Sequence, residues 1–98
     1  MMEKKEYSVN NNEKEQRLEI REQNELAYLE YRYHKEDIAL MHTFVPDPLE
    51  GKGVASSLAR YALEWAREKG KRVIVYCPFV AAYLKRHPEY SDIVDKIH

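Results

Sequence analysis

The feature that most constrains the fold is an unbroken succession of strand, glycine turn, long helix and strand in the middle of the chain. Ile38 to Val45 is apolar on both faces apart from His42 and Thr43, which is typical of a strand inside a sheet. Apolar residues then recur at helical spacing over residues 54–66, and Val73 to Tyr76 has the composition of another buried strand. Two such strands joined by a helix form a right-handed parallel crossover, so the sequence predicts a mixed α/β fold.

The turn before this helix reads Glu50-Gly51-Lys52-Gly53-Val54-Ala55. The first amide groups of a helix have no partner within the helix, and they point at one spot where an anion such as a phosphate can bind. Gly70 supplies a stop at the other end of the helix. By itself the turn could equally be a plain connection, because short glycine motifs often occur by chance.

Two more strands are expected before the crossover. Arg17 to Arg21 alternates apolar and charged residues, and Leu26 to His34 alternates again, with a turn at Gln23-Asn24-Glu25 between them. Together with the strand at Ile38 to Val45 they predict an antiparallel three-stranded sheet that the crossover extends by one parallel strand.

The end of the chain predicts less regular structure. Pro78 is expected to open a short helix that ends near Arg86, with Cys77 at its N-cap, because proline is favoured at the first helical position. The remainder, Glu89 to His98, has Tyr90, Ile93, Val94 and Ile97 at helical spacing and predicts a last turn or short helix.

Length and charge limit the possible classes of protein. Of the 98 residues, 1–15 are nearly all charged or amide-bearing and are expected to be a disordered tail, and 16–98 are expected to form a single domain. The formal net charge of −1 attracts neither nucleic acid nor an anionic membrane. No apolar run approaches the roughly 20 residues of a membrane span, so we expect a cytoplasmic protein. We also expect it to be a monomer. The lone Cys77 and the scattered histidines predict no disulfide and no metal site.

The order of the elements and several motifs resemble the GNAT acetyltransferase superfamily. The run from Glu50 to Ala55 resembles the loop with which that superfamily wraps the pyrophosphate of acetyl-coenzyme A, with Glu50 in place of the usual glutamine or arginine. A narrower likeness, from roughly Arg17 to Val94, is to the small stand-alone, single-domain GNAT-like proteins. It is carried by His42-Thr43-Phe44-Val45-Pro46, Gly51-Lys52-Gly53, Cys77-Pro78-Phe79-Val80 and His87-Pro88-Glu89-Tyr90.

The resemblance implies a minimal GNAT fold and an acetyl-coenzyme A-dependent N-acetyltransferase that acts on a primary amine, either a small amine or a protein lysine or N-terminus. The alternative is a non-catalytic module that binds coenzyme A or acyl-coenzyme A, or that interacts with proteins. Glu50 and the absence of the helices that usually shape the acceptor pocket favour this alternative. The residues implied to contact the coenzyme are Phe44, Val45, Gly51, Lys52, Gly53, Val54, Ala55, Ser56, Cys77, Pro78, Phe79, Tyr83, Arg86 and His87.

Three residues are catalytic candidates on the same basis. Cys77 directly precedes the start of a helix, which could lower the pKa of its thiol and allow the thiolate to carry the acetyl group. The alternative is that Cys77 is a small buried hydrophobic residue. Tyr83 stands where the superfamily has its general acid, or it belongs to the core. His42 is expected on the strand face of Ile38, Leu40 and Phe44, either as a partly buried core histidine or as the proton acceptor for the incoming ammonium. Direct transfer is preferred over a covalent route through Cys77, because an ordinary thiol is only slightly ionised at neutral pH.

Overall fold

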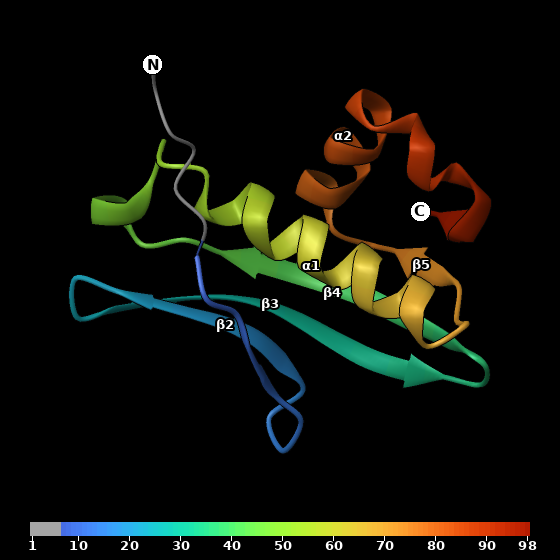
Figure 1. The fold of residues 1–98 in the computed structure, drawn as a ribbon, viewed down its shortest axis with the longest axis horizontal. Helices are drawn as coiled ribbons and strands as arrows, with labels where there is room; N and C mark the ends of the chain where they lie inside the picture. Colours follow the sequence, from blue (N-terminus) through green and yellow to red (C-terminus); the bar gives the residue numbers. More distant parts are fainter. Residues whose placement is uncertain (1–6) are drawn as a thin grey trace.

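The computed structural model describes residues 7–98, which form a six-stranded mixed sheet with two α-helices on one face (Figure 1). The strands lie in the sheet in the order in which they follow one another in the chain. The mixed α/β fold predicted from the sequence is confirmed, with one further strand at each edge. The elements are β1 (Asn10–Asn12), β2 (Arg17–Glu22), β3 (Glu25–His34), β4 (Asp37–Phe44), the 3₁₀ helix η1 (Asp47–Leu49), α1 (Val54–Glu68), β5 (Val73–Val75), α2 (Pro78–Arg86), the 3₁₀ helix η2 (Pro88–Ile93) and β6 (Val94–Ile97).

Strands β1 to β4 form an antiparallel meander. The turn between β2 and β3 consists of Gln23 and Asn24, both with positive φ (53° and 61°), which matches the twist that a two-residue hairpin needs. The predicted strands at Arg17 to Arg21 and Leu26 to His34 are confirmed within a residue at each end.

The expectation of a disordered tail over residues 1–15 is wrong for its second half, because Asn10–Asn12 form β1. This strand pairs with β2 and is held by side-chain amides rather than by apolar burial. The hydroxyl of Tyr31 donates to Oδ1 of Asn11 at 2.6 Å, and Nδ2 of Asn12 donates to Glu19 at 3.1 Å. Residues 1–6 of the expected tail lie outside the described part of the chain.

Helix α1 packs its apolar face on the sheet. Leu58, Ala62 and Leu63 are fully buried in one cluster with Leu29 of β3 and Leu40 of β4. At its end Gly70 has a φ of 69°, and the amide of the following residue, Lys71, donates to Ala66 O at 2.9 Å, which closes the last turn. Packing along the helix and closure at its end hold its N-terminus in place.

A β-bulge at Met41 changes which side chains of β4 face α1. Tyr31 pairs with Leu40 and Glu30 pairs with His42, so Met41 has no partner in β3. Residues directly opposite in an antiparallel pair share a face. Before the bulge the buried residue Leu40 faces α1, whereas beyond it Thr43, opposite the buried Leu29, takes that face.

Strand β5 leaves β4 earlier than the sequence predicts. Their parallel pairing ends at Leu40 and Val75, and the amides of Tyr76 and Cys77 both donate to Leu40 O, at 2.9 and 3.2 Å. Beyond this point β4 continues to Phe44 with no β5 residue beside it. We call this separation the strand opening.

The end of the chain corrects one expectation and confirms another. Helix α2 and its N-cap Cys77 are as predicted. The last segment is not a helix throughout, because residues 94–97 form β6, parallel to β5. The guanidinium of Arg72 donates to Val94 O at 3.2 Å, and the amide of His98 donates to Val75 O at 2.8 Å. These bonds draw the segment onto the free edge of β5.

Candidate functional site

The loop before α1 leaves amide groups and space free at the start of the helix. Gly51 and Gly53 have positive φ (76° and 82°), and a Cβ added at either would meet no atom within 4 Å. The first bond of the helix runs from Ser57 N to Gly53 O at 3.0 Å, so the amides of Val54, Ala55 and Ser56 precede it. The loop therefore has the form of an anion cradle: its backbone needs glycine and its inner side is open.

Tyr7 fixes this loop from outside. Its hydroxyl donates to the carbonyl oxygen of Lys52 at 2.9 Å. This hydrogen bond uses a carbonyl oxygen of the loop and no backbone amide. It therefore holds the loop without occupying the amides at the start of α1.

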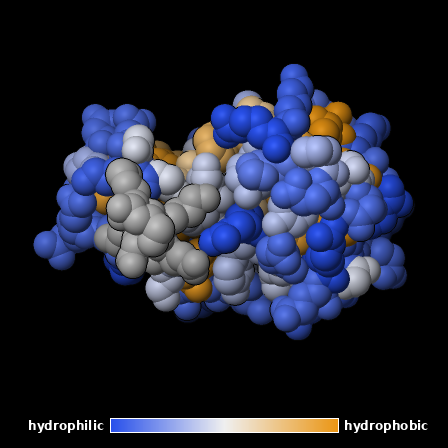
Figure 2. All heavy atoms as spheres, turned by 45° about the horizontal axis from the view of Figure 1, so that its top comes forward, coloured by the Kyte–Doolittle hydropathy of each residue, from blue (hydrophilic) through white to orange (hydrophobic). Residues whose placement is uncertain are grey.

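A cavity of about 860 Å³ opens beside these amides. Figure 2 shows a dip in the outline of the molecule between the part that carries η1 and the part that carries α2, with hydrophobic surface at the dip. We call this hollow the loop cavity. Its lining consists of Thr43, Phe44, Val45, Asp47, Leu49, Glu50, Gly51, Gly53, Val54, Ala55, Ser56 and Phe79.

A second cavity, of about 540 Å³, lies on the α2 side of the same helix start. It shares Gly53 and Ser56 with the loop cavity, so both cavities adjoin the N-terminus of α1. We call this second cavity the basic cavity, because its lining contains three permanent cations and a single carboxylate. The cations are Lys52, Arg60 and Arg86, and the carboxylate is Glu89. The whole lining consists of Lys52, Gly53, Ser56, Ser57, Arg60, Tyr83, Arg86, His87, Glu89 and Tyr90.

Tyr83 and Tyr90 are the two buried aromatic residues that line the basic cavity, and Tyr83 is the catalytic candidate. Its ring stacks on His87 at a centroid distance of 4.1 Å, and only 5% of the residue is exposed. Burial raises the pKa of its hydroxyl, an effect that the nearby guanidinium of Arg60 opposes. The phenol is therefore protonated at neutral pH and can donate a proton.

Cys77 lies beneath the loop cavity rather than on its wall. It is 2% exposed, and its sulfur is 3.1 Å from Oγ1 of Thr43, which does line the cavity. The adjacent Pro78 is exposed at the first position of α2 and lines neither cavity. Of the expected coenzyme contacts, these two residues and no others among residues 7–98 are absent from the two linings.

The expected position of His42 is wrong. It shares the face of Phe44 but not that of Ile38 and Leu40, because the bulge at Met41 turns both residues to the opposite side of the sheet. There His42 is exposed, opposite Glu30, with its ring 6.4 Å from that of Tyr28. The alternative of a partly buried core histidine is also wrong. His42 and Tyr83 therefore lie on opposite faces of the sheet.

Eight lining residues were not among the expected contacts: Thr43, Asp47, Leu49, Glu50, Ser57, Arg60, Glu89 and Tyr90. Thr43 enters the loop cavity only because of the bulge, which no local pattern indicates. Ser57 and Arg60 line the basic cavity from α1. Arg60 could have been found, since it follows Ser56 by four residues and such residues share a helix face.

Within residues 7–98, no three or more histidine, cysteine or acidic side chains are grouped so that they could hold a metal ion. In the same part of the chain no helix is long and apolar enough to cross a membrane.

The chain is similar in sequence and in structure to proteins of one family. The family described as GCN5-related N-acetyl-transferase matches residues 17–93. The solution structure of a GCN5-like protein from Staphylococcus aureus superimposes with a TM-score of 0.72 at 28% identity, covering 94% of this chain and 91% of that one. Protein NATD1 of Bos taurus is 38% identical over 63 residues, and that of Xenopus tropicalis is 35% identical over 63 residues. The match covers 63% of this chain and 56% and 58% of those proteins, so the chain spans little more than half their length.

Proposed function

Because this chain belongs to the GCN5-related N-acetyltransferase family, we propose that it binds acetyl-coenzyme A around the start of α1 and transfers the acetyl group to a primary amine. The observation that carries the proposal is the start of α1, where the amides of Val54, Ala55 and Ser56 precede the first bond of the helix. A cavity opens on either side of these amides, as a bound coenzyme requires.

The residues of the two cavities fit the parts of the coenzyme. The amides of Val54, Ala55 and Ser56 would hold the pyrophosphate, as helix N-termini hold anions. Lys52, Arg60 and Arg86 would neutralise the remaining phosphate charge in the basic cavity. The apolar wall of the loop cavity, with Val45 and Phe79, would take the pantetheine arm and direct it to the strand opening.

The coenzyme, when bound, supplies an acetyl group activated as a thioester. The protein's part in direct transfer is to position the reactants and to move two protons. His42 would accept the proton that the ammonium loses to become the attacking amine, and Tyr83 would donate a proton to the departing thiolate. Since these two residues lie on opposite faces of the sheet, they can serve one reaction only across the strand opening, where β4 and β5 separate.

A second function, coenzyme A binding without turnover, is favoured by one observation. Glu50 lines the loop cavity, and its carboxylate would repel a phosphate group bound there. Such a module would bind the coenzyme and need no acceptor.

Two measurements test the proposal. Calorimetric titration with coenzyme A should give saturable binding, and thiol release from acetyl-coenzyme A should increase when primary amines are added. Binding without thiol release from any amine would establish the second function in place of the first, and absence of binding would reject both.

A further inference from the structure

The stretch of chain that leads into β1 lies beside the start of α1. Tyr7 and Val9 pack against the hydrophobic core, and they line a groove together with Ser57 and Tyr61 of α1. Figure 1 shows this stretch passing the N-terminal end of the helix. The match to the family begins at residue 17, so Tyr7 lies outside the matched part of the chain.

The hydrogen bond of Tyr7 fixes the orientation of one peptide unit in the glycine loop. Its hydroxyl donates to the carbonyl oxygen of Lys52 at 2.9 Å. No peptide bond among residues 7–98 is cis. In a trans peptide unit the C=O and the N–H point in opposite directions, and the N–H of this unit belongs to Gly53. The amide of Gly53 is therefore directed away from Tyr7.

This amide stands next to the free donors at the start of α1. Gly53 is the N-cap of the helix and lines both the loop cavity and the basic cavity. Within residues 7–98, its amide donates to no backbone carbonyl. It can therefore act as a further donor beside the amides of residues 54–56.

The glycines of the loop make this orientation easy to lose. Lys52 lies between Gly51 and Gly53, and glycine adopts positive and negative φ at similar cost. A half-turn of the peptide unit between Lys52 and Gly53 would reverse the sign of φ at Gly53, which glycine accepts. It would also present a carbonyl oxygen, an acceptor, where the amide had been a donor. The bond from Tyr7 opposes this rotation, because the rotation would break it.

We propose that Tyr7 is a positioning residue for the coenzyme, because its bond to Lys52 keeps the amide of Gly53 directed at the pyrophosphate. The inference rests on the proposed function, which supplies the coenzyme. Tyr7 lines neither the loop cavity nor the basic cavity. It therefore sets the affinity for the coenzyme and takes no part in the chemical step.

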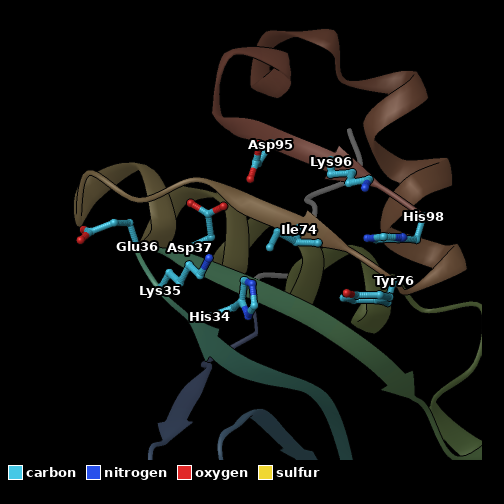
Figure 3. Close-up of a pocket in the computed structure, with 9 residues that line it drawn as sticks. All are labelled: His34, Lys35, Glu36, Asp37, Ile74, Tyr76, Asp95, Lys96 and His98. Atoms are coloured by element: carbon cyan, nitrogen blue, oxygen red, sulfur yellow. The ribbon is translucent and has the colours of Figure 1, made fainter.

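A tyrosine on the other side of the sheet provides the matched control. Tyr76 lines a third cavity, of about 510 Å³, on the face that the helices leave uncovered (Figure 3). Its ring stacks on that of His98 with a centroid distance of 4.3 Å. Tyr76→Phe keeps this stacking and removes a hydroxyl group far from the glycine loop.

The test compares Tyr7→Phe with this control. Tyr7→Phe keeps the ring and removes only the donor, so Kd for coenzyme A should rise about fivefold by calorimetry, as expected for the loss of one hydrogen bond. KM for acetyl-coenzyme A should rise by a similar factor with kcat unchanged, whereas a general loss of structure would lower kcat as well. Tyr76→Phe should leave the affinity for coenzyme A unchanged.

The loop can also be observed without the coenzyme. In the ligand-free protein, the NMR order parameter of the Gly53 amide should be lower in Tyr7→Phe than in the wild type, since the peptide unit is no longer held. An unchanged order parameter, or equal coenzyme affinity in the two proteins, would overturn the role of Tyr7 even if coenzyme A binds. Failure of the wild type to bind coenzyme A, with the order parameter lowered in the variant, would instead refute the proposed function.

Discussion

The hydroxyl oxygen of Thr43 lies 3.1 Å from the sulfur of Cys77, and this contact joins the free end of β4 to the first turn of α2. It spans the separation of β4 and β5 on the side that faces α1. The contact exists because the bulge at Met41 turns Thr43 inward. Cys77 is therefore held in place as a structural partner of a lining residue.

The first prediction follows from that contact. If transfer is direct, Cys77→Ser should keep most of the activity, because a serine hydroxyl can also hydrogen-bond to Thr43, whereas Cys77→Ala leaves that hydroxyl without its partner. Intact-mass analysis of the wild-type protein after incubation with acetyl-coenzyme A alone should show no added acetyl group. A stable adduct on Cys77, lost together with activity in Cys77→Ser, would instead establish the covalent route.

The second prediction concerns the anion cradle. Gly53→Val adds a branched side chain where the backbone has a φ of 82° and where the coenzyme would approach, so the affinity for coenzyme A should fall at least tenfold by calorimetry. Gly70→Val is the matched control, because Gly70 has a φ of 69° and equally open surroundings at the far end of α1. Both variants should lose about 1–2 kcal/mol of stability from backbone strain. If the two variants bound coenzyme A with equal affinity, the coenzyme site would have to lie elsewhere.

The third prediction concerns Tyr83. Tyr83→Phe keeps the ring that stacks on His87 and removes only the proton donor, so kcat should fall about 10²-fold with little change in coenzyme affinity. Tyr61→Phe, at an exposed position of α1, should leave kcat unchanged. An unaltered kcat in Tyr83→Phe would remove the residue from the mechanism.

The fourth prediction concerns His42. Since its side chain is exposed, His42→Ala should leave the melting temperature nearly unchanged while lowering kcat by about 10²-fold. The thermal scan shows whether any loss of rate comes from unfolding. Full activity in the variant would mean that water or another group receives the proton.

The fifth prediction is a pH dependence of stability. The pKa of Asp37 in the folded protein is raised by its pairing with Asp95, so its stabilising contribution is complete at low pH. That contribution is lost as the pH rises through the raised value, above the ordinary carboxyl range near 4. Asp37→Asn should therefore melt at a higher temperature than the wild type at pH 7, with the difference shrinking toward pH 3. The effect should be small, because solvent screens the pair. A difference that does not vary with pH would contradict the pairing.

The crossover could be predicted because its signals are local. The helical period of α1, the glycines of the loop and the apolar strands on either side each follow from a few consecutive residues. The loop residues that line the loop cavity belong to the same run. The register of β4 could not be predicted, because one unpaired residue, Met41, reverses the face of every residue after it.

The two edge strands escaped prediction for a different reason. β1 consists of three asparagines, whose pairing depends on Glu19 and Tyr31 elsewhere in the sheet. β6 has apolar residues at spacings that also fit a helix, and Arg72 and the free edge of β5 decide between the two. Such partners are distant in sequence, so no window along the chain contains them.

The chain-order arrangement of the strands also determines how the site assembles during folding. β1 to β4 are joined by tight turns, so their pairing closes short loops at little entropic cost. β5 and β6 are reached only through the long connections 45–72 and 76–93, which contain both α-helices. Contacts of greater sequence separation slow folding. We therefore expect the meander to form first, and all three cavities to appear only in the last, rate-limiting step, when α1 docks and the two parallel strands join the sheet.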